Sequence, residues 1–227
     1  MKNLGKILCH IPARAGSKRV KSKNSRLLCG KPMIAYAIET AKASNIFDDI
    51  YVNTDSDTIM SLSLALGIKV YRREAWLASD EAKGDDFTAD FMENIQSDTL
   101  VMISPVCPLI TSDIVQNAIE AYAFSDCDTL ITCEQTQMQV FCHDKGVNID
   151  ENAPLSPTQK NPYVQILNWA VTIWDSNTFL KMYRTNRNGY LGTNRLLFPI
   201  ESTSAIKVSH EADFLMAERM LIAKQAQ

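Results

Sequence analysis

KILCHIPARAGSKRVKSKNSRLLCGKPMIAYAIETAKAS, residues 6–44, decides the fold. Its first part, Lys6 to Ala13, is an almost continuous apolar run of strand length, which is typical of a strand buried on both faces. A helix is predicted to begin at Pro32 and to continue to about Ser44, because apolar residues recur there at helical spacing. A buried strand, a loop and a helix in this order open an α/β unit.

The same alternation continues to about residue 135. Strands joined by helices need crossover connections, so the sequence predicts an α/β fold with a doubly wound, mostly parallel sheet and helices on both faces. The predicted strands are 49–54, 68–71, 99–103 and 129–133, and the predicted helices are 56–67, capped by Asp55 or Ser56, 87–95, and 112–124, capped by Thr111 or Ser112.

The pattern changes after Glu134. Residues 135–165 are predicted to leave the core as a small excursion, which contains a hairpin over 140–149 with its turn at 144–146 and an irregular stretch over 152–162. Further strands are predicted at 164–174, 198–200 and 205–208, and a terminal amphipathic helix at 210–224. No linker separates domains, so residues 1–227 are expected to form one domain.

Composition narrows the classes of function. The net charge of −3 argues against non-specific nucleic-acid binding, which needs a broad basic surface. No apolar run approaches the roughly 20 residues of a membrane span, and the polar start, residues 1–6, lacks the apolar region of a signal peptide. A cytoplasmic location is therefore expected, with the six cysteines, which show no metal-ligand spacing, reduced.

Seven of the 23 cationic side chains, and no acidic ones, lie between residues 14 and 31. In a parallel sheet, ligands bind beyond the carboxyl ends of the strands, where this loop must lie. Gly16 allows a phosphate to approach the backbone, and Ser17 and Asn24 offer neutral hydrogen bonds. The loop therefore predicts a polyphosphate site; the alternative is a solvated basic loop. The pattern is neither a Walker A loop nor a G-x-G-x-x-G fingerprint.

Five segments resemble a known family. IPARAGSKR at 11–19, KN at 23–24 and LCGKPMIAY at 28–36 resemble the N-terminal signature of the acylneuraminate cytidylyltransferases, which make CMP-activated sialic and related nonulosonic acids. The similarity continues through IFDDIYVNTDS at 46–56 and reaches YRREAWLASD at 71–80, where the family has R-P-x-x-L-A-x-D. It is close over the first 80 residues.

This resemblance implies a Rossmann-like nucleotidyltransferase that transfers CMP from CTP to a sugar acid, releases pyrophosphate, uses magnesium and forms a homodimer through residues 135–165. A sugar hydroxyl would attack the α-phosphorus, and the cations would stabilise the transition state. Arg14 and Lys23 would be catalytic, and Arg72 would contact the cytosine. The full nucleotide-binding set that the resemblance implies is Ala13, Arg14, Gly16, Ser17, Lys18, Lys23, Asn24, Arg72 and Ser79.

The chain departs from the family after residue 100. SPVCPLI at 104–110 replaces Q-P-T-S-P-L-R, and Trp169 replaces a glycine, either as a core aromatic or as a residue that fills ligand space. Lys207 and Ser209 replace a metal-binding pair of aspartates.

Three explanations of that last change remain open. Another acid, such as Asp55 or Asp57, holds the magnesium; or the Lys207 ammonium replaces part of its charge; or the protein is a catalytically silent nucleotide-binding relative, which is the alternative function.

The remaining candidates are weaker. His10 is predicted to be a core residue, and His143 and His210 are predicted to be exposed, so none of the three is expected to be catalytic. A second basic stretch either grips a substrate carboxylate or forms a solvated loop; it contains Lys181, Arg184, Arg187 and Arg195.

Overall fold

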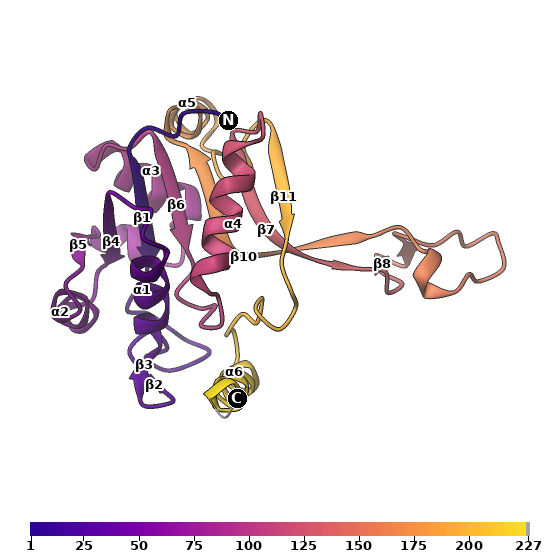
Figure 1. The fold of residues 1–227 in the computed structure, drawn as a ribbon, viewed down its shortest axis with the longest axis horizontal. Helices are drawn as coiled ribbons and strands as arrows, with labels where there is room; N and C mark the ends of the chain where they lie inside the picture. Colours follow the sequence, from indigo (N-terminus) through magenta and orange to yellow (C-terminus); the bar gives the residue numbers. More distant parts are fainter. Residues whose placement is uncertain (226–227) are drawn as a thin grey trace.

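A seven-stranded sheet forms the centre of the computed structural model, which describes residues 1–225 (Figure 1). The strand order is β11-β7-β10-β6-β1-β4-β5, and only β10 runs antiparallel to its neighbours. The mostly parallel, doubly wound sheet is thus confirmed. Its strands are β1 (Ile7–Pro12), β4 (Asp49–Thr54), β5 (Lys69–Arg72), β6 (Thr99–Ile103), β7 (Thr129–Thr136), β10 (Val164–Asp175) and β11 (Arg195–Pro199).

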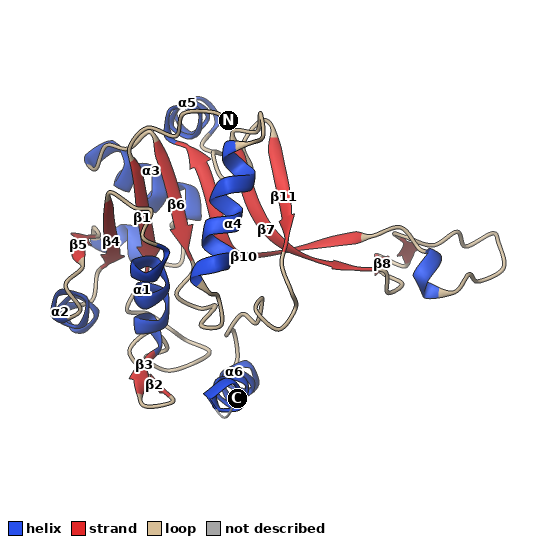
Figure 2. Cartoon of the chain, viewed as in Figure 1, coloured by secondary structure: helices blue, strands red, loops and turns tan. Residues whose placement is uncertain are grey.

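Helices cover both faces of the sheet, as Figure 2 shows. One face packs against α1 (Met33–Ser44), α2 (Asp57–Ala65) and α4 (Ser112–Ala123). The other packs against α3 (Gly84–Asn94) and α5 (Ser176–Asn186). The last helix, α6 (Glu211–Gln225), lies apart from both layers, beyond the carboxyl end of β1.

β1 is an interior strand of the sheet, which suits a segment that is apolar on both faces. Leu8, Cys9 and Ile11 are fully buried, and β1 pairs in parallel with β4 on one side and β6 on the other. The carboxyl ends of these three strands therefore lie at one edge of the sheet. The loop with the cluster of cations leaves from that edge.

β10 is irregular where it passes this edge. Its register against β7 shifts between Leu167 and Thr172, and Trp169 within the shift has a φ of +58°. A bulky residue in this left-handed region costs on the order of 1–3 kcal/mol. The ring packs on Tyr190, with centroids 5.5 Å apart, which offsets part of that cost. The backbone conformation explains why glycine suits this position.

The strands β7 and β10 continue beyond the sheet as a long arm (Figure 1). At its far end lie a hairpin of β8 (Phe141–Cys142) and β9 (Lys145–Gly146) and a short 3₁₀ helix, η2 (Thr158–Lys160). The hairpin is confirmed, but the turn falls at His143 and Asp144, which both have positive φ, and not at 144–146. Two consecutive positive φ angles match the twist of a two-residue hairpin.

Four other predictions differ from the structure. Lys181 and Arg184 lie on α5, Arg187 directly follows that helix and Arg195 begins β11, so the second basic stretch is not a single loop. Residues 205–208 do not form a strand, because their backbone bonds reach a loop, through Val208 N to the Val106 carbonyl at 2.8 Å. The helix predicted from residue 87 begins at Gly84, and the strand predicted from 198 begins at Arg195.

Small elements complete the fold. A hairpin of two short strands, β2 (Leu27–Leu28) and β3 (Lys31–Pro32), precedes α1. A 3₁₀ helix, η1 (Ala75–Ala78), follows β5. No helix within residues 1–225 has the length and apolar character needed to cross a membrane. All six cysteines are free.

His10 is fully buried in β1, as predicted. Its ring stacks on Phe91, with centroids 4.6 Å apart, and its Nε2 accepts a hydrogen bond from Asn53 Nδ2 at 3.0 Å. Burial, and then the charge of Arg73, lower the pKa of His10 well below its usual value. The imidazole is therefore neutral in the folded protein.

This burial predicts a loss of stability in mild acid. The unfolded imidazole takes up a proton below about pH 6.5 while the folded one does not, so the free energy of unfolding should fall by about 1.4 kcal/mol for each pH unit below that value. Denaturant unfolding at about pH 7.5 and about pH 5.5 measures the loss. His10→Gln should show a smaller loss, whereas His143→Asn, on the exposed hairpin, should behave like the wild type. An equal loss in His10→Gln would contradict the assignment.

Candidate functional site: a cationic cavity after β1

The loop between β1 and β2 is held in place by α6. Val20 and Leu28 are buried in one cluster with Phe214 of that helix. Arg26 lies over the Phe214 ring at 4.0 Å and makes two hydrogen bonds of 2.7 Å to Glu211. A loop that would otherwise be mobile is thus fixed between the sheet edge and the last helix.

The loop surrounds a cavity of about 480 Å³. Four of the seven cations of residues 14–31 line it, and Asp80 is the only carboxylate among the lining residues. The predicted site residues in the lining are Arg14, Gly16, Ser17, Lys18, Lys23 and Asn24, and Arg19 is a fourth cation.

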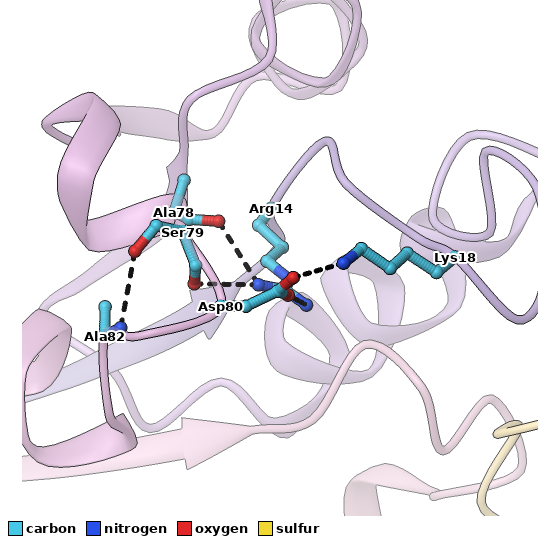
Figure 3. Close-up of polar contacts among 6 residues, drawn as sticks. All are labelled: Arg14, Lys18, Ala78, Ser79, Asp80 and Ala82. Atoms are coloured by element: carbon cyan, nitrogen blue, oxygen red, sulfur yellow. Dashed lines mark hydrogen bonds and ion pairs between the residues drawn. The ribbon is translucent and has the colours of Figure 1, made fainter.

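Two of these cations share the Asp80 carboxylate. Figure 3 shows Arg14 donating to Asp80 and to the backbone carbonyls of Ala78 and Ser79, and Lys18 donating to the other oxygen of Asp80. The Arg14–Asp80 distance is 2.9 Å. Lys18 first, and then Arg14, lower the pKa of Asp80. Asp80 is thus the internal counter-ion of the cavity.

Two features of the cavity are left unmatched by the residues that the structure describes. Asn24 is buried, and its Oδ1 accepts no hydrogen bond from residues 1–225. A Cβ added to Gly16 would meet no atom within 4 Å, so the packing of the chain does not itself require glycine there. An acceptor without a donor and an unfilled position beside cations suit a polar, anionic ligand.

Lys23 forms the inner wall of the cavity. Its Nζ donates to the Val208 carbonyl at 2.8 Å, which joins the loop to the segment just before α6. Burial first, and then Arg19 and Lys207, lower the pKa of Lys23. Lys207 directly precedes Val208, and its exposed side chain does not itself line the cavity.

The residues near the cavity do not fit the divalent ion that the resemblance implies. No group of three or more His, Cys, Asp or Glu side chains that could hold a metal occurs within residues 1–225. Asp55 Oδ1 accepts from Ala15 N at 2.8 Å, and Asp57 is exposed and pairs with Arg72. Lys207 supplies no oxygen, and a hard cation prefers carboxylate oxygens.

Three of the predicted nucleotide-binding residues do not line the cavity. Ala13 is fully buried, with its N–H on the Asn53 carbonyl at 2.9 Å. Ser79 adjoins the cavity only through the hydrogen bond from Arg14. Arg72 is exposed, pairs with Asp57 at 2.8 Å and borders a separate hollow that also contains Asp55.

Arg73, which the sequence analysis did not select, lies in a different environment from Arg72. It is 4% exposed, and its guanidinium lies 4.2 Å from the centre of the Phe87 ring. Its Nε donates to Asn53 Oδ1 at 2.7 Å, and no ion pair involves it among the described residues. Burial lowers its pKa to about 10. A buried cation without a carboxylate partner is typical of an anion-binding or polar-ligand site.

A signal for Arg73 was present in the sequence. The arginine of the R-P-x-x-L-A-x-D pattern stands seven residues before its aspartate, and Arg73, not Arg72, stands seven residues before Asp80. The absence of proline after it, where Glu74 stands, obscured the match.

Comparisons with known proteins agree with this geometry. The family model described as cytidylyltransferase matches residues 8–205. The chain is 30% identical to the post-translational flagellin modification protein B of Campylobacter coli over 236 residues, 99% of this chain and 98% of that protein. It is 35% identical to the N-acylneuraminate cytidylyltransferase of Streptococcus agalactiae serotype III over 152 residues, 64% of this chain but only 37% of that enzyme.

The fold is also similar to a solved structure. A CMP:2-keto-3-deoxy-manno-octonic acid synthetase complexed with CTP superposes with a TM-score of 0.74 at 17% identity, and the match covers 96% of this chain and 99% of that one. At this identity, the likeness concerns the fold.

The shared Asp80 carboxylate predicts that it competes with anions. Asp80→Asn should raise the affinity for inorganic pyrophosphate by about threefold to tenfold, because Arg14 and Lys18 would no longer be neutralised while the carbonyls of residues 78 and 79 still position Arg14. Isothermal titration calorimetry measures the change. Glu39→Gln, which frees Lys31 away from the cavity, is the control and should have no effect. Weaker binding in Asp80→Asn would show that Asp80 supports the ligand.

Proposed function

The chain belongs to the cytidylyltransferase family, and we propose that it transfers CMP from CTP to a sugar acid of the sialic or nonulosonic type, with release of pyrophosphate. The observation that carries this proposal is the cavity of four cations at the carboxyl end of β1. The likeness to an acylneuraminate cytidylyltransferase supports the class of acceptor.

In this proposal the triphosphate of CTP occupies the cavity. Arg14, Lys18 and Lys23 bind the phosphates, and the triphosphate displaces Asp80 from the first two. The open space at Gly16 lets a phosphate approach the backbone, and Ser17 adds a hydroxyl.

We place the nucleoside between the loop and the end of β5. The Asn24 Oδ1 that lacks a donor is suited to a ribose hydroxyl or an amino group. Arg73 replaces Arg72 in our assignment of the cytosine contact, because Arg73 is buried and held by Asn53 whereas Arg72 is tied to an exposed acid. Ser79 lies next to Arg14 and completes this side.

The chemistry requires neutralisation of charge and no covalent intermediate. A hydroxyl of the sugar acid attacks the α-phosphorus in line, and the bond to the β-phosphate oxygen breaks. Arg14 and Lys23 stabilise the negative charge that develops on the phosphates and on the leaving pyrophosphate. Fixed cations in a partly buried site act strongly because they need no reorganisation.

Cytidylyltransferases of this type generally use a divalent metal. The donor set near the cavity does not fit a magnesium ion held by this protein, since Lys207 and Ser209 stand where the resemblance implies aspartates and Asp55 is engaged by Ala15. The steps above therefore use the chain's own cations.

We further propose that residues 1–227 form one domain that pairs with a second copy through the arm, residues 135–165. The arm carries large apolar side chains that the single chain leaves exposed, as a surface covered in a dimer would. They are Met138, Phe141, Val147, Leu155 and Tyr163. We place the reaction in the cytoplasm, where six free cysteines stay reduced.

Pyrophosphate release from CTP in the presence of a panel of sialic and other nonulosonic acids tests the activity. Arg14→Gln and Lys23→Gln should each lower kcat/KM by about 100-fold or more, because each removes a donor to the developing charge. Lys21→Gln is the control, since Lys21 belongs to the same loop but does not line the cavity.

The outcome separates enzyme from binder. Release of pyrophosphate with CTP but not with ATP, GTP or UTP is the expected result. No turnover with any acceptor, combined with thermal stabilisation by CTP, would instead support the catalytically silent relative.

The dimer has a test of its own. Light scattering after gel filtration should give twice the 25.4 kDa of one chain. Phe141→Ser combined with Leu155→Ser should shift the mass towards the monomer, because both side chains are exposed on the arm. Leu64→Ser on α2, which is 58% exposed but distant in the fold, should leave the dimer intact. A wild-type monomer would contradict the assignment.

A further inference from the structure

Three cations that make no ion pair with the described residues lie at or near the cavity. Arg19 and Lys23 line the cavity, and Lys207 lies in the segment between β11 and α6 that borders it. None of the three takes part in an ion pair among the described residues, whereas Arg14 and Lys18 share Asp80 and Arg26 pairs with Glu211. Crowded like charges repel one another unless an anion offsets them.

Backbone contacts fix the position of the Lys207 segment. Val208 N donates to the Val106 carbonyl, and Lys23 Nζ donates to the Val208 carbonyl, both at 2.8 Å. Val106 itself lines the cavity. Lys207 therefore belongs to the same short segment as Val208, which contacts the wall of the cavity. Burial, and then the charges of Arg19 and Lys207, lower the pKa of Lys23.

The nearby carboxylates are all engaged elsewhere. Asp213 Oδ2 accepts from the N–H groups of Ser209 and His210, both at 2.8 Å, and so caps α6. Asp80 is bound by Arg14 and Lys18, and Asp55 by the Ala15 N–H. Among residues 1–225, no three of these or other His, Cys, Asp or Glu side chains come together as a group that could hold a divalent cation arriving with phosphates.

We propose that the Arg19–Lys23–Lys207 cluster binds the terminal phosphates of a polyphosphate in their metal-free form, with Lys207 supplying charge that a divalent ion would otherwise bring. The cluster takes pyrophosphate or the β and γ phosphates of a nucleotide. A magnesium ion on those phosphates brings two positive charges towards three cations and finds no group of carboxylates that could hold it, so it weakens binding. This inference rests on the proposed function only for the identity of the nucleotide.

Binding of inorganic pyrophosphate, measured by calorimetry in EDTA and in excess magnesium, tests the proposal. The wild type should bind metal-free pyrophosphate more tightly than the magnesium complex. Lys207→Asp should weaken metal-free binding by about tenfold or more and reverse the preference, because it replaces a cation with a metal ligand. Lys21→Asp is the matched control, because it makes the same charge change at an exposed lysine of the β1–β2 loop that neither lines the cavity nor is among the charges that act on Lys23.

A milder variant guards against misfolding. Lys207→Gln removes the charge without adding a ligand, so it should weaken metal-free binding without creating a magnesium preference; thermal unfolding confirms that each variant is folded. The proposal is overturned if the wild type binds pyrophosphate only with magnesium, or if Lys207→Asp and Lys21→Asp behave alike.

The two proposals fail differently. Metal-free pyrophosphate binding without CMP transfer to any acceptor would refute the proposed function and leave this inference standing. CMP transfer by a protein that binds only magnesium pyrophosphate would do the reverse.

Discussion

Repulsion among the cations that follow β1 is the constraint on which the site depends. Seven positive side chains between residues 14 and 31 cannot be placed beside one another without counter-charges, and the structure supplies them from separate parts of the chain. Glu211 of α6 forms an ion pair with Arg26, and Glu39 of α1 forms one with Lys31. Asp80 pairs with both Arg14 and Lys18. Of the three cations left over, Arg19 and Lys23 line a cavity, whereas Lys21 is exposed and lies outside the lining. The packing of α6 against the loop therefore also helps to set the shape of the site.

The sequence alone was sufficient to predict the bounds of elements that are buried along their whole length. β6 has the predicted bounds because all five of its residues are buried and the run ends at polar residues. α5 was missed because its apolar residues are few and basic residues interrupt them. The segment 205–208 looks like a strand because it is apolar, yet its partner is a loop, and hydrophobic pattern alone does not reveal the partner.

The candidate site was predictable in its charge and only partly in its geometry. Local sequence placed Arg14, Lys18 and Lys23 together, since one loop carries them. It did not reveal that Asp80, 66 residues after Arg14, supplies their counter-ion, because that contact depends on the parallel pairing of β1, β4 and β5. Nor did it separate Arg72, the last residue of β5, from Arg73, since successive side chains of an extended backbone point to opposite sides and only Arg73 is buried.

The double pairing of Asp80 has a consequence for which solutes are retained by the protein. Asp80 already accepts hydrogen bonds from Arg14 and Lys18. An incoming anion must therefore bind these two cations at least as strongly as Asp80 does before it can displace the carboxylate. Chloride and other monovalent ions, with one charge, replace it poorly, whereas a chain of linked phosphates offers several charges at once. The cavity therefore favours multivalent anions over monovalent ones, independently of any contact with a base. The basic loop consequently does not retain the monovalent ions that are far more abundant around it.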